Sequence, residues 1–340
     1  MKRKIFLSLF SGATLATAIP FTLKAEDVAV GPKKRIPAYL KPGDTIGITC
    51  PAGYITEAEI APAVLQMETW GLQVKIGKTV GMRDFTFGGT DDQRQADFQA
   101  MIDDSTVNAI MCARGGYGFV RILDQIDFTN LKHQPKWIIG FSDITILHVH
   151  LQKNLGLASI HSKMCNSFPN NWEMADDTQK DTILSIKRAL FGEAMTYHSP
   201  ANIFNRFGNV KGELVGGNLR CIENLAGSIS EIDTDGKILF LEDTGEALYS
   251  IDRMFYNLLR SDKLKNLKGL IIGGFKLPNS EDPTAFGRSL EQIVLEKLKG
   301  LSYPVAFDFP VGHQRLNYAL KCGIKHQFQV NETGAYLNEV

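Results

Sequence analysis

The amino-acid sequence predicts an α/β protein made of two successive halves, each built from strands that alternate with helices. Two observations indicate this fold class. From Thr45 onward, short β-rich apolar runs alternate with segments whose apolar residues recur at helical spacing. The chain has 340 residues, 44% of them hydrophobic and 22% charged, which is typical of a globular protein with room for two cores.

The first half contains five runs typical of strands, with helical patterns or glycine-rich turns between them. The predicted strands cover residues 45–50, 74–76, 107–113, 137–140 and 158–160. The predicted helices cover residues 57–70, 91–102, 119–123 and 144–154. This order favours an open sheet covered by helices on both faces, in a domain over residues 40–165.

Residues 166–209 have a different character, and we expect them to form the crossover between two domains. Loop-like stretches at 166–172 and 199–202 flank a predicted helix over 178–190. The second domain, over 210–340, then resumes the alternation of strands and helices. Its predicted strands cover residues 210–215, 237–241, 270–272 and 305–307, and its predicted helices cover 219–226, 250–260 and 287–298, with a Gly-Gly-Asn turn at 216–218.

Residues 1–25 have the layout of a secretory signal peptide. A positive start is followed by a mostly apolar stretch and a small residue before Glu26, and polar residues dilute the apolar stretch too much for a good membrane anchor. Removing the segment takes away four positive charges and no negative ones, which leaves 33 against 37 and a net charge of −4. We therefore expect an exported, periplasmic protein that has no integral membrane segment after signal removal and does not bind nucleic acid.

The cysteines and histidines give no sign of a metal site or a cofactor. The five cysteines are scattered without a C-x-x-C pair, and no histidine or carboxylate cluster has ligand spacing. We expect Cys50 and Cys112 to be small apolar residues in strands. The sequence leaves the oligomeric state open, with a homodimer as one option.

The strongest local signal for chemistry is Ser142, in the run Trp137-Ile-Ile-Gly-Phe-Ser-Asp-Ile-Thr145. An apolar strand ends at Gly140 and a helix begins almost at once, so Ser142 is predicted on a tight turn that presents its hydroxyl. The N–H groups at the start of the helix could stabilise an oxyanion. The alternative is that Ser142 or Asp143 is only a helix N-cap.

A nucleophilic serine needs a base, which is usually a histidine oriented by a carboxylate. Of seven histidines, His161 and His313 follow short strands, and a loop at a strand end can project a side chain into a cleft. Glu242 comes directly after the run Lys237-Ile-Leu-Phe-Leu241, where an unpaired charge would be costly. The alternative to a catalytic role for Glu242 is a structural ion pair with Arg253 or Lys321. Asp243 and Glu246 are other acidic residues nearby that could be mistaken for the catalytic carboxylate.

The run Arg114-Gly-Gly-Tyr-Gly118 follows a predicted strand but lacks the spacing of a nucleotide-binding loop. Its glycines instead allow backbone N–H groups to approach a reacting carbonyl, as half of an oxyanion hole requires.

Together these segments resemble the LD-carboxypeptidase family of serine peptidases, which also includes the microcin-immunity amidases. The resemblance runs from about Leu40 to Gln327. The motifs that carry it are Leu40-Lys-Pro-Gly-Asp-Thr-Ile, Arg114-Gly-Gly-Tyr-Gly118 with Arg121, Gly140-Phe-Ser-Asp-Ile-Thr145, Gly217-Asn-Leu219, Leu241-Glu-Asp-Thr-Gly-Glu246 with Ile251-Asp-Arg253, and Gly312-His313.

The resemblance implies an N-terminal domain similar to class I glutamine amidotransferases and a C-terminal swivelling β/α domain, with the site between them. It implies Ser142 as nucleophile, Glu242 and His313 as its partners, and the N–H groups of Asp143 and of Gly115 or Gly116 as oxyanion donors. We expect substrate contacts from Arg114, Tyr117 and Asn218. The implied reaction is release of terminal D-alanine from a murein tetrapeptide through an acyl-enzyme, without a metal or cofactor.

Two departures from the family are visible. Relatives often have His-Gly-Pro-Met where this chain has His161-Ser-Lys-Met164, and murein-recycling relatives usually work in the cytoplasm, whereas this chain carries an export signal. Two alternatives stay open: an amidase that acts on a peptidyl or acyl-adenylate-like compound, and an exported peptide-binding protein without catalysis.

Overall fold

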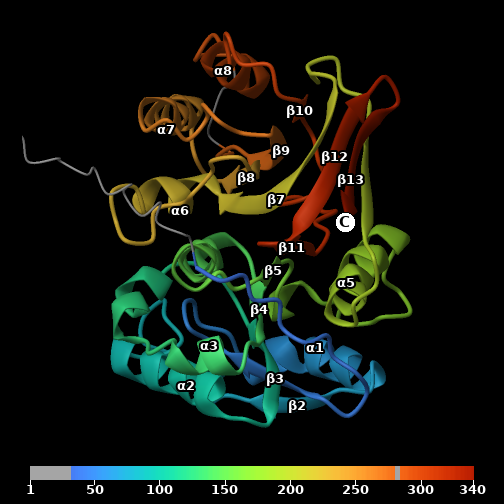
Figure 1. Cartoon of the computed structure of the whole chain (residues 1–340). Coiled ribbons are helices and arrows are strands. Elements are labelled where there is room, and N and C mark those ends of the chain that lie inside the picture. Colours follow the sequence, from blue (N-terminus) through green and yellow to red (C-terminus); the bar gives the residue numbers. More distant parts are fainter. Residues whose placement is uncertain (1–31, 280–283) are drawn as a thin grey trace, which may run out of the picture. The chain divides into compact units, whose positions relative to one another are not determined.

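The computed structural model describes residues 32–279 and 284–340, and residues 32–340 form one compact unit. The predicted signal segment lies outside the described residues. Two sheets organise the unit, with strand orders β11-β5-β4-β3-β1-β2 and β10-β9-β8-β7-β12-β13-β6 (Figure 1). The predicted α/β class is confirmed.

The first sheet is parallel except for β11. Its strands are β1 (Thr45–Thr49), β2 (Gln73–Ile76), β3 (Val107–Cys112), β4 (Trp137–Gly140), β5 (Ser159–His161) and β11 (Leu320–Cys322). The helices of this part are α1 (Glu57–Thr69), α2 (Asp91–Asp103), α3 (Thr129–His133), α4 (Thr145–His150) and α5 (Asp177–Leu190).

The second sheet is mixed. Its strands are β6 (Thr196–Pro200), β7 (Gly208–Asn218), β8 (Ile238–Thr244), β9 (Gly269–Lys276), β10 (Val305–Ala306), β12 (Lys325–Asn331) and β13 (Gly334–Glu339). Its helices are α6 (Leu219–Asn224), α7 (Leu248–Arg260) and α8 (Leu290–Lys297). Strands β7 to β10 are parallel, whereas β12, β13 and β6 add to β7 as an antiparallel group.

Alternation along the strands of the first sheet sends side chains to two separate cores. In β3, Ile110 and Cys112 belong to the core that contains α2 and α4, while Ala109 and Met111 belong to the core that contains α1 and α5. A strand buried on both faces reads as a continuous apolar run, which is why this sheet was visible in the sequence. Capping boxes at Thr56 and Thr90 begin α1 and α2.

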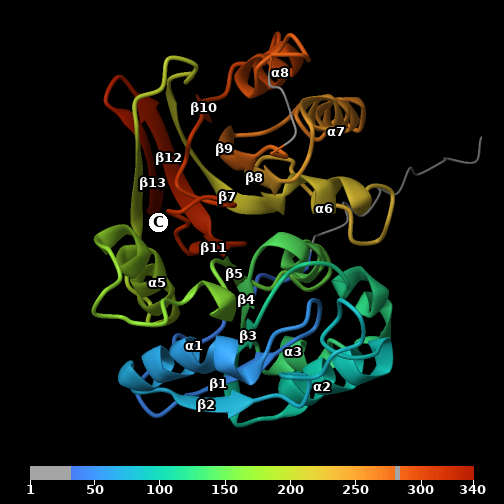
Figure 2. The same cartoon turned by 180° about the vertical axis from the view of Figure 1, so that it is seen from behind.

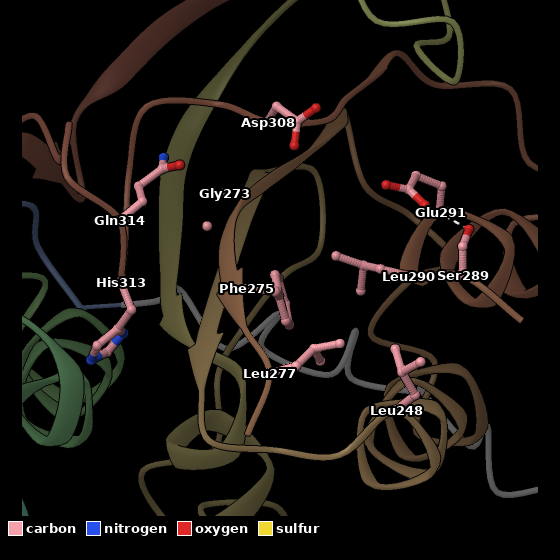
Figure 3. A pocket seen from close by; sticks show the side chains of 11 residues that line it. Leu248, Gly273, Phe275, Leu277, Ser289, Leu290, Glu291, Asp308, His313 and Gln314 are labelled. Atoms are coloured by element: carbon pink, nitrogen blue, oxygen red, sulfur yellow. Dashed lines mark hydrogen bonds between the residues drawn. The ribbon is translucent and has the colours of Figure 1, made fainter. Parts of the chain in front are cut away.

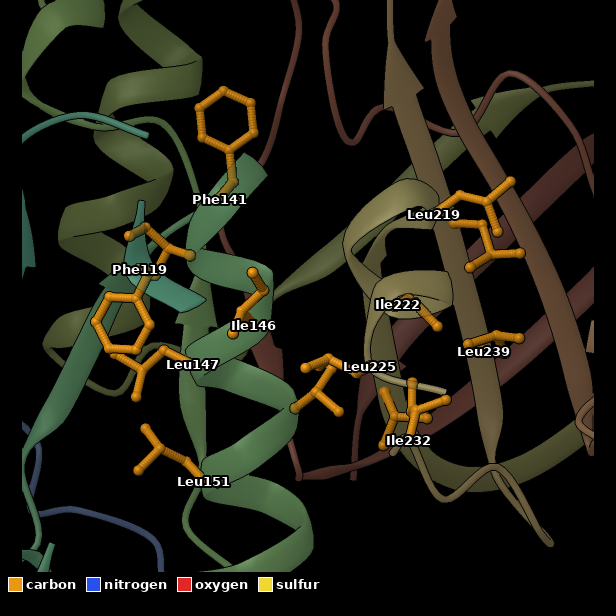
Figure 4. Close-up of a cluster of buried hydrophobic side chains, with 14 of the residues drawn as sticks. Phe119, Phe141, Ile146, Leu147, Leu151, Leu219, Ile222, Leu225, Ile232 and Leu239 are labelled. Carbon is orange, nitrogen blue, oxygen red and sulfur yellow. The ribbon is translucent and has the colours of Figure 1, made fainter. Parts of the chain in front are cut away.

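The core on the α4 side continues into the second half of the chain. Ile146 and Leu147 of α4 lie in the same cluster as Leu219 and Ile222 of α6, and the two helices face each other in Figure 4. The backbone N–H of Asn218 also donates to Thr145 Oγ1 at 3.0 Å. These contacts fix the end of β7 against the helix that follows Ser142.

Two strands cross the predicted domain boundaries. Strand β11, from the C-terminal half, pairs with β5 at the edge of the first sheet, and Figures 1 and 2 both show it beside β5. Strand β6, inside the predicted crossover, pairs with β13 of the second sheet. The expected loop at 199–202 is therefore wrong in part, because Ser199 and Pro200 belong to β6.

The expected turn at 216–218 is also wrong, because these residues are the end of β7. The two glycines do not form a turn; they allow neighbouring atoms to approach the backbone of β7 closely. A Cβ on Gly216 would lie 1.9 Å from Phe240 O, and one on Gly217 would lie 2.5 Å from Thr145 Oγ1. Both residues have positive φ, which glycine adopts without strain.

The remaining differences concern helix type and short strands. The predicted helix over 119–123 is two 3₁₀ turns, at Phe119–Arg121 and Leu123–Gln125, and the end of the predicted 144–154 helix is a π turn over Leu151–Leu155. Strands β12 and β13 were not predicted, although they form a hairpin in the interior of the second sheet and β12 alternates buried and less buried residues.

All five cysteines are unpaired, and four of them are buried. Cys112 ends β3 and Cys50 directly follows β1, as apolar packing residues. In the described part of the chain, no helix is long and apolar enough to cross a membrane.

Candidate active site

Ser142 lies on the expected tight turn between β4 and α4. Its φ of +61° is in the left-handed region, which is strained for a residue other than glycine. A Cβ on Gly140 would lie 3.0 Å from Ile144 Cγ2, so the turn leaves little room there. The residue at the cap position of the turn is Phe141, and no capping hydrogen bond from a side chain is found there among the described residues, which argues against the N-cap alternative for Ser142.

Glu242 and His313 meet in the second half of the chain. Glu242 lies within β8, two residues before its end, so its predicted place directly after the strand is wrong by a short distance. Its side chain is fully buried, and Oε2 lies 2.5 Å from Nδ1 of His313, 71 residues away. A carboxylate only accepts, so Nδ1 carries the proton and Nε2 is left as the acceptor.

Gly312 lets the histidine loop approach this carboxylate. Its φ is +100°, and a Cβ there would lie 2.3 Å from Glu242 Cβ. Its N–H donates to Asn317 Oδ1 at 2.8 Å, which fixes the loop. The pair of residues Gly312-His313 is therefore a structural requirement for the contact with Glu242.

The alternative partners proposed for Glu242 are wrong. Lys321 pairs with Glu339 at 3.0 Å, and Arg253 lies over the ring of Tyr249. The other two acidic residues near Glu242 have structural contacts of their own. Asp243 accepts from the N–H of Arg220 at 2.8 Å, and Glu246 forms an ion pair with Arg220 at 3.0 Å.

Phe141 connects the serine turn with the histidine loop. Its ring lies 4.9 Å from the ring of His313 and 5.8 Å from that of His161, measured between centroids. The residue next to Ser142 therefore contacts the imidazole. Among the described residues, no hydrogen bond joins Ser142 Oγ to His313, so the structure brings these two groups to one site without linking them directly.

The glycine-rich loop after β3 lies against the serine. A Cβ on Gly115 would lie 3.1 Å from Ser142 Cβ, and Gly116 has a φ of +90°. Gly115 O accepts from the N–H of Gly53 at 2.8 Å, which holds the loop. The backbone of Gly115 and Gly116 is thus placed beside the nucleophile candidate, as an oxyanion donor requires.

Asp143 is held by its side chain. Its Oδ2 accepts from the N–H of Phe119 at 2.8 Å, and burial raises the pKa of Asp143 to about 6. The side chain thus ties the start of α4 to the 3₁₀ turn after the glycine-rich loop. Burial and the nearby Glu242 likewise raise the pKa of Asp243 to about 6.

The three residues predicted to contact the substrate differ in exposure and in the contacts that their side chains already make within the protein. Tyr117 is 53% exposed, with its ring 6.0 Å from that of Phe87. Arg114 is exposed and donates to Tyr54 O at 3.1 Å. Asn218 is buried, and its side chain caps α6 through Cys221 N and donates to Asp243 Oδ1. Its carboxamide therefore already has contacts within the protein.

Two further residues lie at the site: His161, which the sequence had offered beside His313 as a candidate base, and Lys163, which was not predicted. His161 is fully buried against Phe141 and Phe240, and burial lowers its pKa well below the usual range, so its ring is neutral. Lys163 lies with its ammonium 5.4 Å from the centre of the Phe141 ring and donates to Gln314 O at 2.9 Å. The sequence did mark this segment, because residues 161–164 depart from the family pattern.

A cavity of about 360 Å³ borders His313 on the side of the second sheet (Figure 3). Its walls include apolar side chains, and its polar groups include the carboxylates of Glu291 and Asp308. A second cavity, of about 340 Å³, is bordered by Lys163 and Arg315. No cluster of three or more His, Cys, Asp or Glu side chains within the described residues could hold a metal ion.

Comparison with known proteins assigns both halves of the chain to one family. Residues 46–162 match the LD-carboxypeptidase N-terminal domain, and residues 211–328 match the LD-carboxypeptidase C-terminal domain. A probable murein peptide carboxypeptidase from Bacillus subtilis (strain 168) is 34% identical over 305 residues, which cover 88% of this chain and 93% of the relative.

Two other relatives agree with this assignment. The microcin C7 self-immunity protein MccF from Escherichia coli is 26% identical, over 85% of this chain and 91% of the relative. The crystal structure of a muramoyltetrapeptide carboxypeptidase from Oxalobacter formigenes superposes with a TM-score of 0.77 at 26% identity, over 87% of this chain and 98% of the other. The two halves that carry Ser142 on one side and Glu242 with His313 on the other thus make this chain a member of the LD-carboxypeptidase family of peptidases.

Proposed function

We propose that this peptidase is a serine-type carboxypeptidase that releases terminal D-alanine from murein tetrapeptides by cleaving an L,D-peptide bond. The observation that carries the serine mechanism is the contact between Glu242 and His313, at the same site as a serine on a strained turn. The names of the relatives from Bacillus subtilis and Oxalobacter formigenes support the substrate class.

In the proposed reaction, His313 Nε2 takes the proton of Ser142 Oγ while the oxygen attacks the peptide carbonyl. Glu242 accepts from Nδ1, which fixes the tautomer and stabilises the imidazolium. The imidazolium then protonates the leaving amine of D-alanine, and water hydrolyses the acyl-enzyme. The hydrogen bond from Ser142 to His313 forms when substrate closes the site, as catalytic hydrogen bonds often tighten only in the substrate complex.

The N–H groups of Asp143 and of Gly115 or Gly116 receive the oxyanion. The support for this role is the close approach of Gly115 to Ser142 and the anchoring of both segments, through Gly53 N–H on one side and Asp143 on the other. Donors held in advance stabilise developing charge without having to reorganise.

The second candidate function is amide hydrolysis on an acyl-adenylate-like compound, and the relative that favours it is the microcin C7 self-immunity protein. Product analysis after incubation with a defined murein tetrapeptide and with such a compound separates the two. Faster release of D-alanine supports our proposal, and faster cleavage of the second compound supports the alternative.

Replacing Ser142 with Ala tests the mechanism. We expect D-alanine release to fall by a factor of at least about 10⁴ with little change in the midpoint of thermal unfolding, because only the nucleophile is lost. Wild-type turnover by Ser142→Ala would refute the assignment. Loss of labelling by a fluorophosphonate probe in the same variant would show that Ser142 is the reactive serine.

We also propose that the protein acts outside the cytoplasm, because residues 1–25 have the charge and apolar pattern of a secretory signal. In that setting it would trim murein peptides of the cell wall. Fractionation of cells and N-terminal sequencing of the mature protein test this, and an uncleaved cytoplasmic product would contradict it.

A further inference from the structure

A second cavity is connected to the predicted catalytic groups through Lys163 and Arg315, two of its lining residues, and has no role in the proposed bond cleavage. It measures about 340 Å³ and is bordered by Lys163, Ser167, Gln179, Thr182, Ile183 and Arg315. Two of these residues carry positive charge, and the cavity has no carboxylate in its lining. Its position follows from Lys163, which comes two residues after β5, and from Arg315, which comes two residues after His313.

Lys163 belongs to the same cluster as the catalytic candidates. Its ammonium lies 5.4 Å from the centre of the Phe141 ring, and that ring lies 4.9 Å from the ring of His313. Phe141 directly precedes Ser142, so Lys163 borders the site where the peptide bond would react. Glu242 is the carboxylate whose charge acts on the pKa of Lys163, which burial lowers overall.

The ammonium of Lys163 has unused hydrogen-bonding capacity. It has three donors, and its one hydrogen bond goes to Gln314 O at 2.9 Å. Within the described residues it forms no ion pair, whereas Arg315 is paired with Asp176. A half-buried cation without a partner is costly, and an incoming anion would remove that cost.

Thr182 supplies an independent sign of a ligand. Its side chain is only 2% exposed and lines this cavity, yet its hydroxyl has no hydrogen-bond partner within residues 32–279 and 284–340. Buried hydroxyls in proteins are normally hydrogen-bonded, so this one is unsatisfied. Its oxygen is almost inaccessible, so rotation of the Thr182 side chain must accompany any bond to an acceptor in the cavity. An ammonium and a free hydroxyl on one small cavity suit a carboxylate.

The cavity beside His313 that Figure 3 shows has the opposite character. Its charged lining residues are Glu291 and Asp308, which would repel a carboxylate. The two cavities therefore divide the surroundings of residues 313–315 into an anionic part and a cationic part. In a peptide cut by a carboxypeptidase, the free carboxylate lies one residue from the scissile bond, about 3.8 Å in Cα spacing.

We propose that the cavity bordered by Lys163, Thr182 and Arg315 binds the terminal carboxylate of the peptide, with the Lys163 ammonium as its main anion-binding group. This inference rests on the proposed carboxypeptidase function. It adds the Lys163 ammonium as the group by which the enzyme would recognise the C-terminal end of a peptide.

The test compares a tetrapeptide that ends in D-alanine with the same peptide ending in D-alaninamide. We expect the wild type to prefer the acid. In Lys163→Met, the acid-over-amide ratio of kcat/KM should fall by about 10- to 100-fold, because a hydrogen-bonded charge partner of the acid is lost. Lys163→Arg should recover part of the ratio. Thr182→Val should lower it less, since a neutral donor contributes less.

A second measurement separates this inference from the proposed function. Dissociation constants of both peptides are measured in the Ser142→Ala background, where no turnover is needed. Loss of the acid preference on adding Lys163→Met supports the carboxylate site. An unchanged preference, or an equal loss of affinity for both peptides, would overturn it. A failed carboxypeptidase function would show instead as wild-type enzyme that releases no D-alanine.

Lys136 offers a matched control. It is a buried lysine that, like Lys163, donates to backbone carbonyl groups, those of Met101 at 3.0 Å and Asp104 at 2.5 Å. It directly precedes β4, whereas the serine turn follows that strand. Lys136→Met should lower stability and leave the acid-over-amide ratio unchanged. A change in the ratio as large as that of Lys163→Met would mean that the ratio responds to general damage, which also overturns the inference.

Discussion

The two sides of the candidate site are built in different ways. The nucleophile side is local: Gly140, Ser142 and the start of α4 are neighbours in sequence, and the strained φ of Ser142 arises within that short stretch. The other side is long-range: Glu242 and His313 are 71 residues apart and meet because the 312–313 loop passes close to β8. The nucleophile side therefore depends on the conformation of one short turn, whereas the contact between Glu242 and His313 depends on correct assembly of the second sheet.

After Ser142→Ala, the largest effect is expected from Glu242→Gln, which keeps the shape of the long-range side and removes its charge. We expect kcat to fall by about 10³- to 10⁴-fold, because the amide no longer stabilises the imidazolium and can favour the wrong histidine tautomer. Steady-state kinetics on the tetrapeptide measure this. Glu223→Gln is the matched control, since Glu223 is a partly exposed ion-pair residue of α6. Equal activity of the two variants would remove Glu242 from the mechanism.

The next prediction compares substitutions of two glycines, Gly140 on the nucleophile side and Gly312 on the histidine side of the site. In Gly312→Ala the new methyl group would lie 2.3 Å from Glu242 Cβ at a φ of +100°, so the histidine loop must move. In Gly140→Ala it would lie 3.0 to 3.1 Å from Ile144. We expect activity to fall by about 100-fold or more in Gly312→Ala, with about 2 kcal/mol of stability lost, and less of both in Gly140→Ala.

Urea unfolding and kcat measurements on the two glycine variants report these effects. If Gly140→Ala proves the more damaging of the two, the local serine turn is more constrained than the loop that carries His313, which is the opposite of what we expect.

The smallest effect concerns the pH dependence of stability at Asp143. Burial raises its pKa from an ordinary value of 3.8 to about 6, so between these values the folded protein binds more protons than the unfolded chain. Stability must then fall as pH rises through this window. Asp143→Asn keeps an acceptor for Phe119 N–H and removes the titration, and should gain about 2 kcal/mol relative to wild type between pH 4 and pH 7.

Urea unfolding of wild type and Asp143→Asn at several pH values measures this difference. Asp243 has the same direction of shift, so the slope of the wild type is only partly removed. A constant difference in unfolding free energy between the two proteins across the window would show that Asp143 does not titrate as its burial implies.

Much of the first sheet could be predicted from the sequence, because β3 and β4 are almost entirely buried and read as apolar runs, and because α1, α2 and α5 begin with capping side chains. The prediction of β4 over residues 137–140 matches the structure residue for residue. Strands β12 and β13 were missed although they form a hairpin, whose alternation of buried and less buried residues in β12 is a local signal that could have been used. Strand β6 was missed because its partner β13 lies far along the chain.

The sequence by itself determined the class of fold, the turn that carries Ser142 and, through family motifs, the identities of the residues to examine. Only the tertiary structure decided what those residues touch: Glu242 contacts His313 and neither Lys321 nor Arg253, and the Asn218 side chain caps α6. It also showed that Lys163 lines a cavity and has no ion-pair partner in the described part of the chain. The physical reason is range. A turn or a cap is settled by neighbours along the chain, whereas a buried charge finds its partner only where the sheets bring distant segments together.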